Sequence, residues 1–301
     1  MTLDPRHDPH RKPTFLHWIE YGALKAVAFF ARHASSRFID GISAALWCAV
    51  APRMRRHSRA DRNLAAALPN LTNDERNKIL NEMWDNLGRT TTEAFALSQI
   101  ADGPNAVTFN FSDDVIALMQ SAQPAIFVGL HAGNWEVPAI AAERFGKPLM
   151  GVYQKIINPL IDELVRSIRQ RFYSGGLHAK GAETVTRIRR GLSQGYSVAI
   201  MADLRDAHGE FVPFFGQDAR STVFPALLAR LHKAPIIAIR ATRIGVRQFR
   251  IDAVLVPLMN DKDRNAEVRE NTLRIQKQFE QWIKEDPSQW MWGHNRWDTE
   301  G

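Results

Sequence analysis

The stretch "AIFVGLHAGNWEVPAI", residues 125–140, joins a short apolar run to a segment with the features of a helix start. The apolar run is short and free of charge, so it predicts a buried strand. Gly133 frees the turn that follows, and Pro138 suits an early position in the next helix. His131 therefore stands at the carboxyl end of a predicted strand, which is where α/β folds place their chemistry.

Strands and helices alternate on both sides of this stretch. Further strands are predicted over 148–154, 196–203, 235–244 and 248–257, the last two pairing across a turn at Gly245. Helices are predicted over 73–99, 158–172, 181–195, 221–234 and about 266–284. A cap at Thr72 or Asn73 and the pair Asn158–Pro159 mark two helix starts. The alternation predicts an α/β fold with a mostly parallel central sheet flanked by helices.

The spacing of His131 and Glu136 limits how the two side chains can meet. Residues five apart in a regular helix are about 140° apart around its axis, so His131 must lie in the turn, with the helix starting at or after Gly133. Asn134 is then a candidate cap, and Glu136 falls in the first helical turn, where the helix dipole favours a carboxylate. A carboxylate on one imidazole nitrogen leaves the other as a base. The alternative is a structural capping pair without catalytic function.

The turn contains neither serine nor cysteine. A His131–Glu136 dyad would therefore activate a hydroxyl or amine that a substrate brings, with no protein nucleophile. Four of the other histidines, His178, His208, His232 and His294, have no metal-ligand spacing, and no Gly-rich phosphate loop or dinucleotide fingerprint occurs. The sequence thus predicts no bound metal and no cofactor held by the protein.

Composition narrows the class of protein and its partners. The 301 residues are 45% hydrophobic and 24% charged, which excludes global disorder. Thirty-nine Lys+Arg against 32 Asp+Glu give a net charge of +7, typical of proteins that meet nucleic acid, anionic membranes or acidic partners. Cys48, the single cysteine, excludes a disulfide framework and suits a reducing compartment. The polar residues 1–13 do not resemble a secretory signal peptide.

The N-terminal region has a different pattern from the rest of the chain. One helical stripe recurs at i, i+3, i+4, i+7 and i+8 through Phe15, Trp18, Ile19, Gly22, Ala23, Ala26, Phe29 and Phe30. A second apolar helix is predicted over 38–50, and five arginines follow within 52–62. These features predict an interfacial membrane anchor, the alternative being a helical hairpin packed on the main domain. The longest uncharged run in this N-terminal region, 41–51, is too short for a spanning helix of about 20 residues.

Several segments resemble a known family. The H-x4-E pattern in "HAGNWE" is similar to the signature of glycerolipid-type acyltransferases. Four further segments resemble, in order, motifs of the bacterial lipid A biosynthesis acyltransferases: "ADRNLAAALPNLTNDERNKILNEMWDNLGRTTTEAF" (60–95), "GVYQKIINPLIDELVRSIRQRF" (151–172), "MADLRDAHGEFVPFFGQDARST" (201–222) and "PSQWMWGHNRW" (287–297). The resemblance covers about four-fifths of the chain, and five ordered matches are far more specific than one short motif.

The resemblance implies both an activity and a location. An enzyme of this family moves a fatty acyl group from an acyl thioester, with acyl carrier protein as the expected donor, to a hydroxyl of a lipid A precursor. It would work at the cytoplasmic face of an inner membrane, without nucleic acid as a partner. Residues 1–52 would then be membrane-associating helices, and residues 53–301 the acyltransferase domain.

The same resemblance implies roles for individual residues. His131 deprotonates the acceptor hydroxyl, and Glu136 orients His131. Candidate substrate-binding residues are Arg169, Asp203, Asn134, Lys155 and Arg205. A guanidinium such as that of Arg169 can hold a phosphate in two hydrogen bonds, although a solvated arginine is the simpler interpretation. Asp203 would bind an acceptor hydroxyl or order Arg205, a capping or turn role being the alternative.

Two features leave the prediction open. The family often has Tyr-Arg-Pro where this chain has Tyr153, Gln154 and Lys155, so Lys155 supplies the missing charge or the acceptor pocket differs. Trp290, Trp292 and Trp297 are expected to pack as a C-terminal plug; an acyl-tunnel wall or a membrane contact is the alternative. Competing functions are acylation of another membrane lipid (a glycosylated phosphoinositide, an ornithine lipid or a lysophospholipid), thioester hydrolysis, and a basic membrane- or nucleic-acid-binding module.

Overall fold

The computed structural model describes residues 12–297. Most of residues 1–13, on which the expectation about a signal peptide rests, lies outside the described residues. The helices are α1 (Phe15–His33), α2 (Ser36–Val50), α3 (Arg55–Ala67), α4 (Asn73–Glu93), α5 (Leu97–Asp102), α6 (Asp113–Gln120), α7 (Ala139–Arg144), α8 (Pro159–Arg169), α9 (Ala182–Ser193), α10 (Phe224–His232) and α11 (Arg264–Glu285). The strands are β1 (Val107–Phe111), β2 (Ile126–Gly129), β3 (Leu149–Tyr153), β4 (Leu177–Ala179), β5 (Ser197–Met201), β6 (Arg205–Phe214), β7 (Gln217–Ser221), β8 (Ile236–Gly245) and β9 (Gln248–Leu255).

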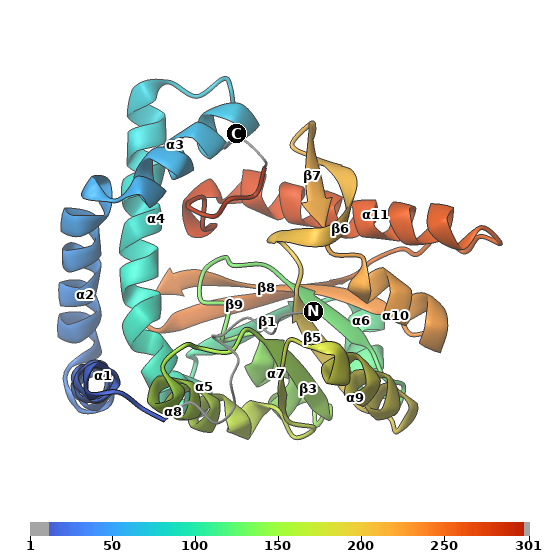
Figure 1. Cartoon of the computed structure of the whole chain (residues 1–301), viewed down its shortest axis with the longest axis horizontal. Coiled ribbons are helices and arrows are strands. Elements are labelled where there is room, and N and C mark those ends of the chain that lie inside the picture. Colours follow the sequence, from blue (N-terminus) through green and yellow to red (C-terminus); the bar gives the residue numbers. More distant parts are fainter. Residues whose placement is uncertain (1–11, 298–301) are drawn as a thin grey trace.

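The predicted α/β fold with a mostly parallel sheet is confirmed. Within residues 12–297, seven strands form one sheet in the order β1-β9-β8-β2-β5-β3-β4, and β6 and β7 form a separate hairpin (Figure 1). Only β8 and β9 pair antiparallel in the large sheet, across the turn predicted at Gly245. The neighbours β2 and β5 are parallel, with Gly129 opposite Met201, so both strands end at the same edge.

Alternating side chains of the strands build a core on each face of the sheet. On one face, Ile126 and Val128 pack with residues of α9, α10 and α11. On the other face, Phe127 packs with residues of α5, α6 and α7. The period of two along β2 explains this division, because successive side chains of a strand point to opposite faces. Because β2 is buried on both faces, its sequence is a continuous apolar run, which is the pattern that predicted it.

Local capping chemistry starts the helices where the sequence indicated. Thr72 and Glu75 form a reciprocal capping box at the start of α4. Asn158 caps α8, and Pro159 occupies the first helical position. Each cap satisfies backbone N–H groups that the first turn of a helix leaves unpaired.

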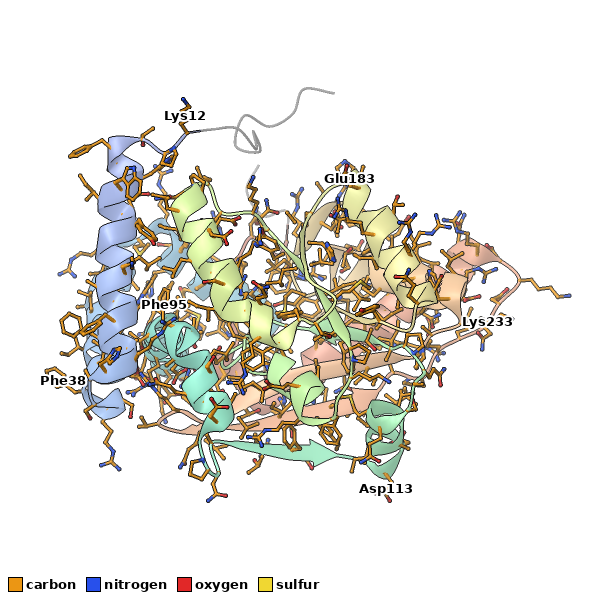
Figure 2. All side chains as sticks on the ribbon, turned by 90° about the horizontal axis from the view of Figure 1, so that it is seen from below. Lys12, Phe38, Phe95, Asp113, Glu183 and Lys233 are labelled. Carbon is orange, nitrogen blue, oxygen red and sulfur yellow. The ribbon has the colours of Figure 1, made fainter. Side chains whose placement is uncertain are left out.

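The N-terminal helices pack on the main body while their largest apolar side chains face outward. Gly88 of α4 lies so close to Ala44 of α2 that an added Cβ would be 2.5 Å from the Ala44 Cα. The inward side of α1 carries Ala28 and Ala31. The exposed apolar residues of the two helices are Phe15, Leu16, Trp18, Ile19, Phe29, Phe30, Phe38, Ile42, Leu46 and Val50. Figure 2 shows Phe38 pointing away from the protein at this end of the molecule.

The exposed residues include the large members of the stripe that the sequence analysis singled out, led by Phe15 at 82% exposure. Among the described residues, no helix has both the length and the apolar character that crossing a membrane requires.

Candidate active site

The turn after β2 is held in a conformation that requires glycine. Gly133 has a φ of +56°, and a Cβ at this position would lie 2.0 Å from the carbonyl oxygen of Ala241. The Gly133 carbonyl accepts hydrogen bonds from the Asn86 amide at 2.9 Å and the Thr90 hydroxyl at 3.0 Å. The turn runs through Pro138, and α7 begins at Ala139. His131 therefore lies in a rigid turn at the carboxyl edge of the sheet, as the spacing argument required.

Asp203, not Glu136, holds the imidazole of His131. Nδ1 of His131 lies 2.8 Å from Oδ1 of Asp203, and the backbone N–H of His131 donates to Oδ2 at 2.8 Å. The register of the sheet explains the pairing: Gly129 faces Met201, and each functional residue lies two positions beyond its strand partner. The predicted hydrogen bond between His131 and Glu136 is thus corrected, because a neighbouring strand supplies the carboxylate.

Asp203 is completely buried and fully hydrogen-bonded. Its Oδ2 also accepts from the indole N–H of Trp290 at 2.9 Å. Burial opposes ionisation of Asp203, but the charge and hydrogen bonds of His131 and the Trp290 bond hold its pKa well below the ordinary range. An ionised Asp203 accepts a hydrogen bond from Nδ1–H of His131, which leaves Nε2 as the free acceptor.

Glu136 forms a bidentate ion pair with Arg169 instead. Nε of Arg169 donates to Oε2 of Glu136 at 2.7 Å, and Nη2 donates to Oε1. Glu136 lies in the turn and not in the first helical turn as predicted, because α7 begins only at Ala139. Arg169 is the last residue of α8. Burial alone would lower the pKa of Arg169, but the adjacent carboxylate of Glu136 raises it. The pair is a fixed charge arrangement at the wall of the cleft described below, since both residues line that cleft.

Asn134 supports the turn from inside the protein. The side chain is 0% exposed, its amide donates to Glu93 at 3.0 Å, and its oxygen accepts from the Glu136 backbone at 3.1 Å. Glu93 also pairs with Arg243, whose Nε donates to the Asn86 side chain at 2.8 Å. The predicted helix cap at Asn134 is corrected, because α7 begins at Ala139 and its N-cap is Pro138. Asn134 supports the turn instead, and its predicted contact with substrate finds no support, because this buried network occupies the side chain.

The other substrate-binding candidates lie around an open cleft of about 520 Å³ beside His131. Arg205, the first residue of β6, lines the cleft, and so does Gln154 after β3. Lys155 is half-buried and does not contribute to the lining, which is a correction to its predicted position on the site. Lys180 lines the cleft from a distant segment and is a cation that sequence reasoning missed. The cleft thus joins His131 to two exposed cationic side chains.

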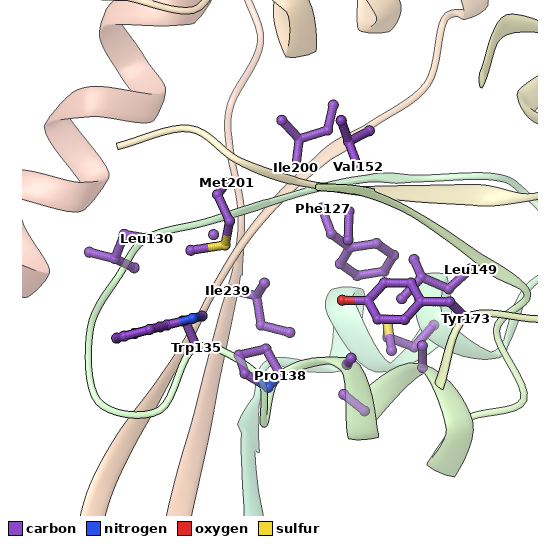
Figure 3. A pocket seen from close by; sticks show the side chains of 16 residues that line it. Phe127, Leu130, Trp135, Pro138, Leu149, Val152, Tyr173, Ile200, Met201 and Ile239 are labelled. Carbon is purple, nitrogen blue, oxygen red and sulfur yellow. The ribbon is translucent and has the colours of Figure 1, made fainter. Parts of the chain in front are cut away.

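An apolar pocket extends from this cleft between the sheet and α7. The two share Trp135, Val152, Tyr173, Ile200 and Met201. Figure 3 shows Trp135 and Met201 toward one end of the pocket, and Leu149 and Tyr173 toward the other. Burial raises the pKa of the Tyr173 phenol above its ordinary value, and the charge of Glu136 adds to this effect. The pocket therefore offers a neutral apolar lining next to the histidine.

The C-terminal segment packs against His131 and Asp203. Trp290 and Trp292 are almost fully buried, as expected of a packed plug. Trp290 donates to Asp203, and Met291 donates its backbone N–H to the His131 carbonyl at 3.1 Å. The ring of His294 lies 5.3 Å from the His131 ring, and burial followed by the charge of His131 lowers the pKa of His294 to about 4.

No local sequence pattern predicted that residues 287–297 contact Asp203. The only indication that this segment belongs to the site was its resemblance to the last of the ordered family motifs. Among residues 12–297, no three His, Cys, Asp or Glu side chains gather closely enough to hold a metal ion.

The chain is similar to one family of known proteins and to two individual proteins with related descriptions. The family described as "Bacterial lipid A biosynthesis acyltransferase" matches residues 7–299. A "Lipid A biosynthesis lauroyltransferase" of Escherichia coli strain K12 is 26% identical over 258 residues, which cover 81% of this chain and 80% of that protein. A "Lipid A biosynthesis acyltransferase" of Haemophilus influenzae is 23% identical over 248 residues, or 79% of this chain and 74% of that protein.

Proposed function

This chain belongs to the bacterial lipid A biosynthesis acyltransferase family, and from that premise we propose that it moves a fatty acyl group from an acyl thioester to a hydroxyl of a lipid A precursor. The observation that carries the proposal is the His131–Asp203 pair, because its histidine lines a cleft that continues into an apolar pocket. This arrangement places a general base beside a cleft, and the cleft continues into a pocket whose lining suits hydrocarbon.

His131 acts as the general base for a direct attack. Its Nε2 takes the proton of the acceptor hydroxyl while the hydroxyl oxygen bonds to the thioester carbon. When the tetrahedral intermediate collapses, the carbon–sulfur bond breaks and the thiolate takes the proton from Nε2. Asp203 stabilises the imidazolium between these steps and keeps the ring oriented. No acyl-enzyme intermediate forms, since the turn carries neither serine nor cysteine.

Cationic side chains bind the anionic acceptor. Arg169 donates to Glu136 through Nε and Nη2, so its Nη1 group is left for a phosphate of the lipid. Lys180 and Arg205 face the same cleft and add positive charge. The acyl chain of the donor enters the apolar pocket beside Trp135, where burial of its methylene groups contributes about 0.8 kcal/mol each.

The exposed apolar face of α1 and α2 rests on the membrane that holds the acceptor. Ten large apolar side chains on these helices remain in contact with solvent, and a patch of this kind marks an interaction surface. Residues 1–52 would therefore associate with the cytoplasmic face of an inner membrane. The donor is acyl carrier protein, and the enzyme itself holds no cofactor.

A panel of donors and acceptors tests the function. The purified protein is offered acyl carrier protein loaded with one fatty acid, together with lipid A precursors, phosphoinositide glycolipids, ornithine lipid and lysophospholipids, and products are identified by mass spectrometry. The expected result is one added acyl group on a lipid A precursor, abolished by His131→Ala. If no lipid A precursor is acylated, the proposed acceptor is wrong.

A second acceptor class has one observation in its favour. Gln154 lines the cleft at the position where the family often has arginine, so the acceptor need not present a phosphate there. Acylation of another membrane lipid is therefore the alternative, and the same panel separates the two.

A further inference from the structure

A shallow basic depression lies between α9 and α10, away from the turn that carries His131. Its walls are Thr186, Arg189, Arg190, Ser193, Leu231 and His232. The four α9 residues recur at intervals of three or four, so they share one face of the helix. Figure 2 shows Glu183 at the start of α9 and Lys233 just after α10 on the same side of the molecule, far from Phe38.

The charge on this face is not offset within the described chain. Arg189 and Arg190 are exposed, and no carboxylate of residues 12–297 lies within ion-pairing distance of either. Arg187, by contrast, pairs with Glu183 at 3.2 Å along the same helix. Lys180 and Lys233 add exposed positive charge at the ends of the face. Uncompensated surface charge of one sign attracts a partner of the opposite sign.

Apolar side chains are exposed among these cations. Leu231 is 54% exposed and Val185 is 41% exposed. Protein–protein interfaces commonly have an apolar centre and a charged rim, whereas a surface for free anions needs no apolar centre. The face therefore suits an acidic protein.

The same helix leads directly into the catalytic cleft. Gly181, Thr184 and Val185, at the start of α9, line the cleft that contains His131. Arg189 lies four residues beyond Val185, which is roughly 6 Å along a helix. A protein bound to the basic face would thus hold its acyl group near the mouth of the cleft.

We propose that the α9–α10 face is the docking surface for an acidic acyl carrier protein, a proposal that rests on the proposed acyl transfer. The carrier contacts Arg189 and Arg190 and inserts its thioester arm past Val185 toward His131. The position favours a protein over a membrane as occupant, because Figure 1 shows α9 and α10 at the opposite end of the sheet from α1 and α2.

The test compares two charge-reversal variants in kinetics with two donors. Arg189→Glu/Arg190→Glu removes the docking charge, and Arg269→Glu/Lys277→Glu makes the same change in net charge on exposed positions of α11. Each variant is assayed with acyl carrier thioester and with a carrier-free acyl-pantetheine thioester. We expect the first variant to raise KM for the acyl carrier roughly tenfold or more, with kcat changed less than twofold. Transfer from the carrier-free donor stays unchanged, and the α11 variant behaves as the unmodified enzyme.

Other outcomes overturn the proposal. Unchanged KM for the acyl carrier, or an equal loss with the carrier-free donor, excludes a docking role. Loss of binding to phosphatidylglycerol vesicles with unchanged carrier kinetics assigns the face to the membrane instead. If the unmodified protein transfers from no thioester, the proposed function fails, and calorimetric titration with the carrier then decides docking alone: binding lost in the α9 variant and kept in the α11 variant supports it, and any other pattern rejects it.

Discussion

Asp203 contacts a histidine, whereas Glu136 contacts an arginine, although both carboxylates are buried beside the turn that follows β2. An imidazole can bind and release a proton during a reaction, so the His131–Asp203 pair can carry a proton. A guanidinium keeps its proton, so the Glu136–Arg169 pair can only hold charge in place. The partner of each carboxylate, more than its own burial, therefore separates proton transfer from positioning.

The largest expected effect comes from neutralising the carboxylate of the first pair. Asp203→Asn keeps the size of the side chain but removes the charge that stabilises protonated His131. We expect kcat to fall on the order of 10³-fold, measured with saturating donor and acceptor. Asp206→Asn, on the same segment and also at the cleft, serves as the control. A fall of less than threefold in the Asp203 variant would show that His131 needs no ionised partner.

The next largest effect is a pH dependence of stability, caused by His294 beside the His131–Asp203 pair. His294 has a pKa of about 4 in the folded protein, against about 6.5 unfolded, so the unfolded chain binds more protons between these values. Stability is therefore present above pH 6.5 and falls as pH drops toward 4, by up to about 3 kcal/mol. Urea unfolding of His294→Gln should show a flatter pH dependence in this window.

A matched substitution controls for the loss of an imidazole. His33 is exposed at the end of α1, and His33→Gln should keep the pH dependence of the unmodified protein. Equal slopes for His294→Gln and the unmodified protein would contradict the role of buried His294.

A smaller effect is expected from the second pair. Glu136→Gln leaves Arg169 without its counter-charge but keeps His131–Asp203 intact. We expect kcat/KM for the acceptor to fall about tenfold and the free energy of unfolding by about 1 to 3 kcal/mol. Kinetics and urea unfolding of one preparation measure both. A loss in kcat as large as that of Asp203→Asn would remove the distinction between the two pairs.

The smallest effect tests whether the positioning side of the cleft accepts another cation. Gln154→Arg introduces the residue that the family often has at this cleft-lining position. An exposed charge interaction of 0.2–1 kcal/mol corresponds to a decrease in KM for a phosphorylated acceptor of roughly threefold. Lys155→Arg, outside the cleft lining, should leave KM unchanged. An increase in KM for Gln154→Arg would favour an acceptor without a phosphate at this point.

Sequence reasoning was most successful where the cause was local. The strand before His131, the glycine turn, the caps at Thr72 and Asn158 and the hairpin at Gly245 all depend on neighbouring residues, and the structure confirms them. The partner of His131 was predicted from the spacing in the turn and from the H-x4-E resemblance, both of which favoured the nearer carboxylate, Glu136. Asp203 is 72 residues away, and only the pairing of β2 with β5 brings it into contact.

The sequence by itself determined the alternation of strands and helices, the place of His131 at a strand end, the ordered motifs of the family and the apolar stripe of α1. Hydrophobic periodicity and backbone preferences act over a few residues, so they can be read along the chain. Only the tertiary structure decided that Asp203 binds the imidazole of His131 and that Arg169 pairs with Glu136. It also decided that Trp290 contacts Asp203 and that His294 lies beside His131. Those contacts depend on strand order and on where the C-terminal segment packs, and no local pattern encodes either.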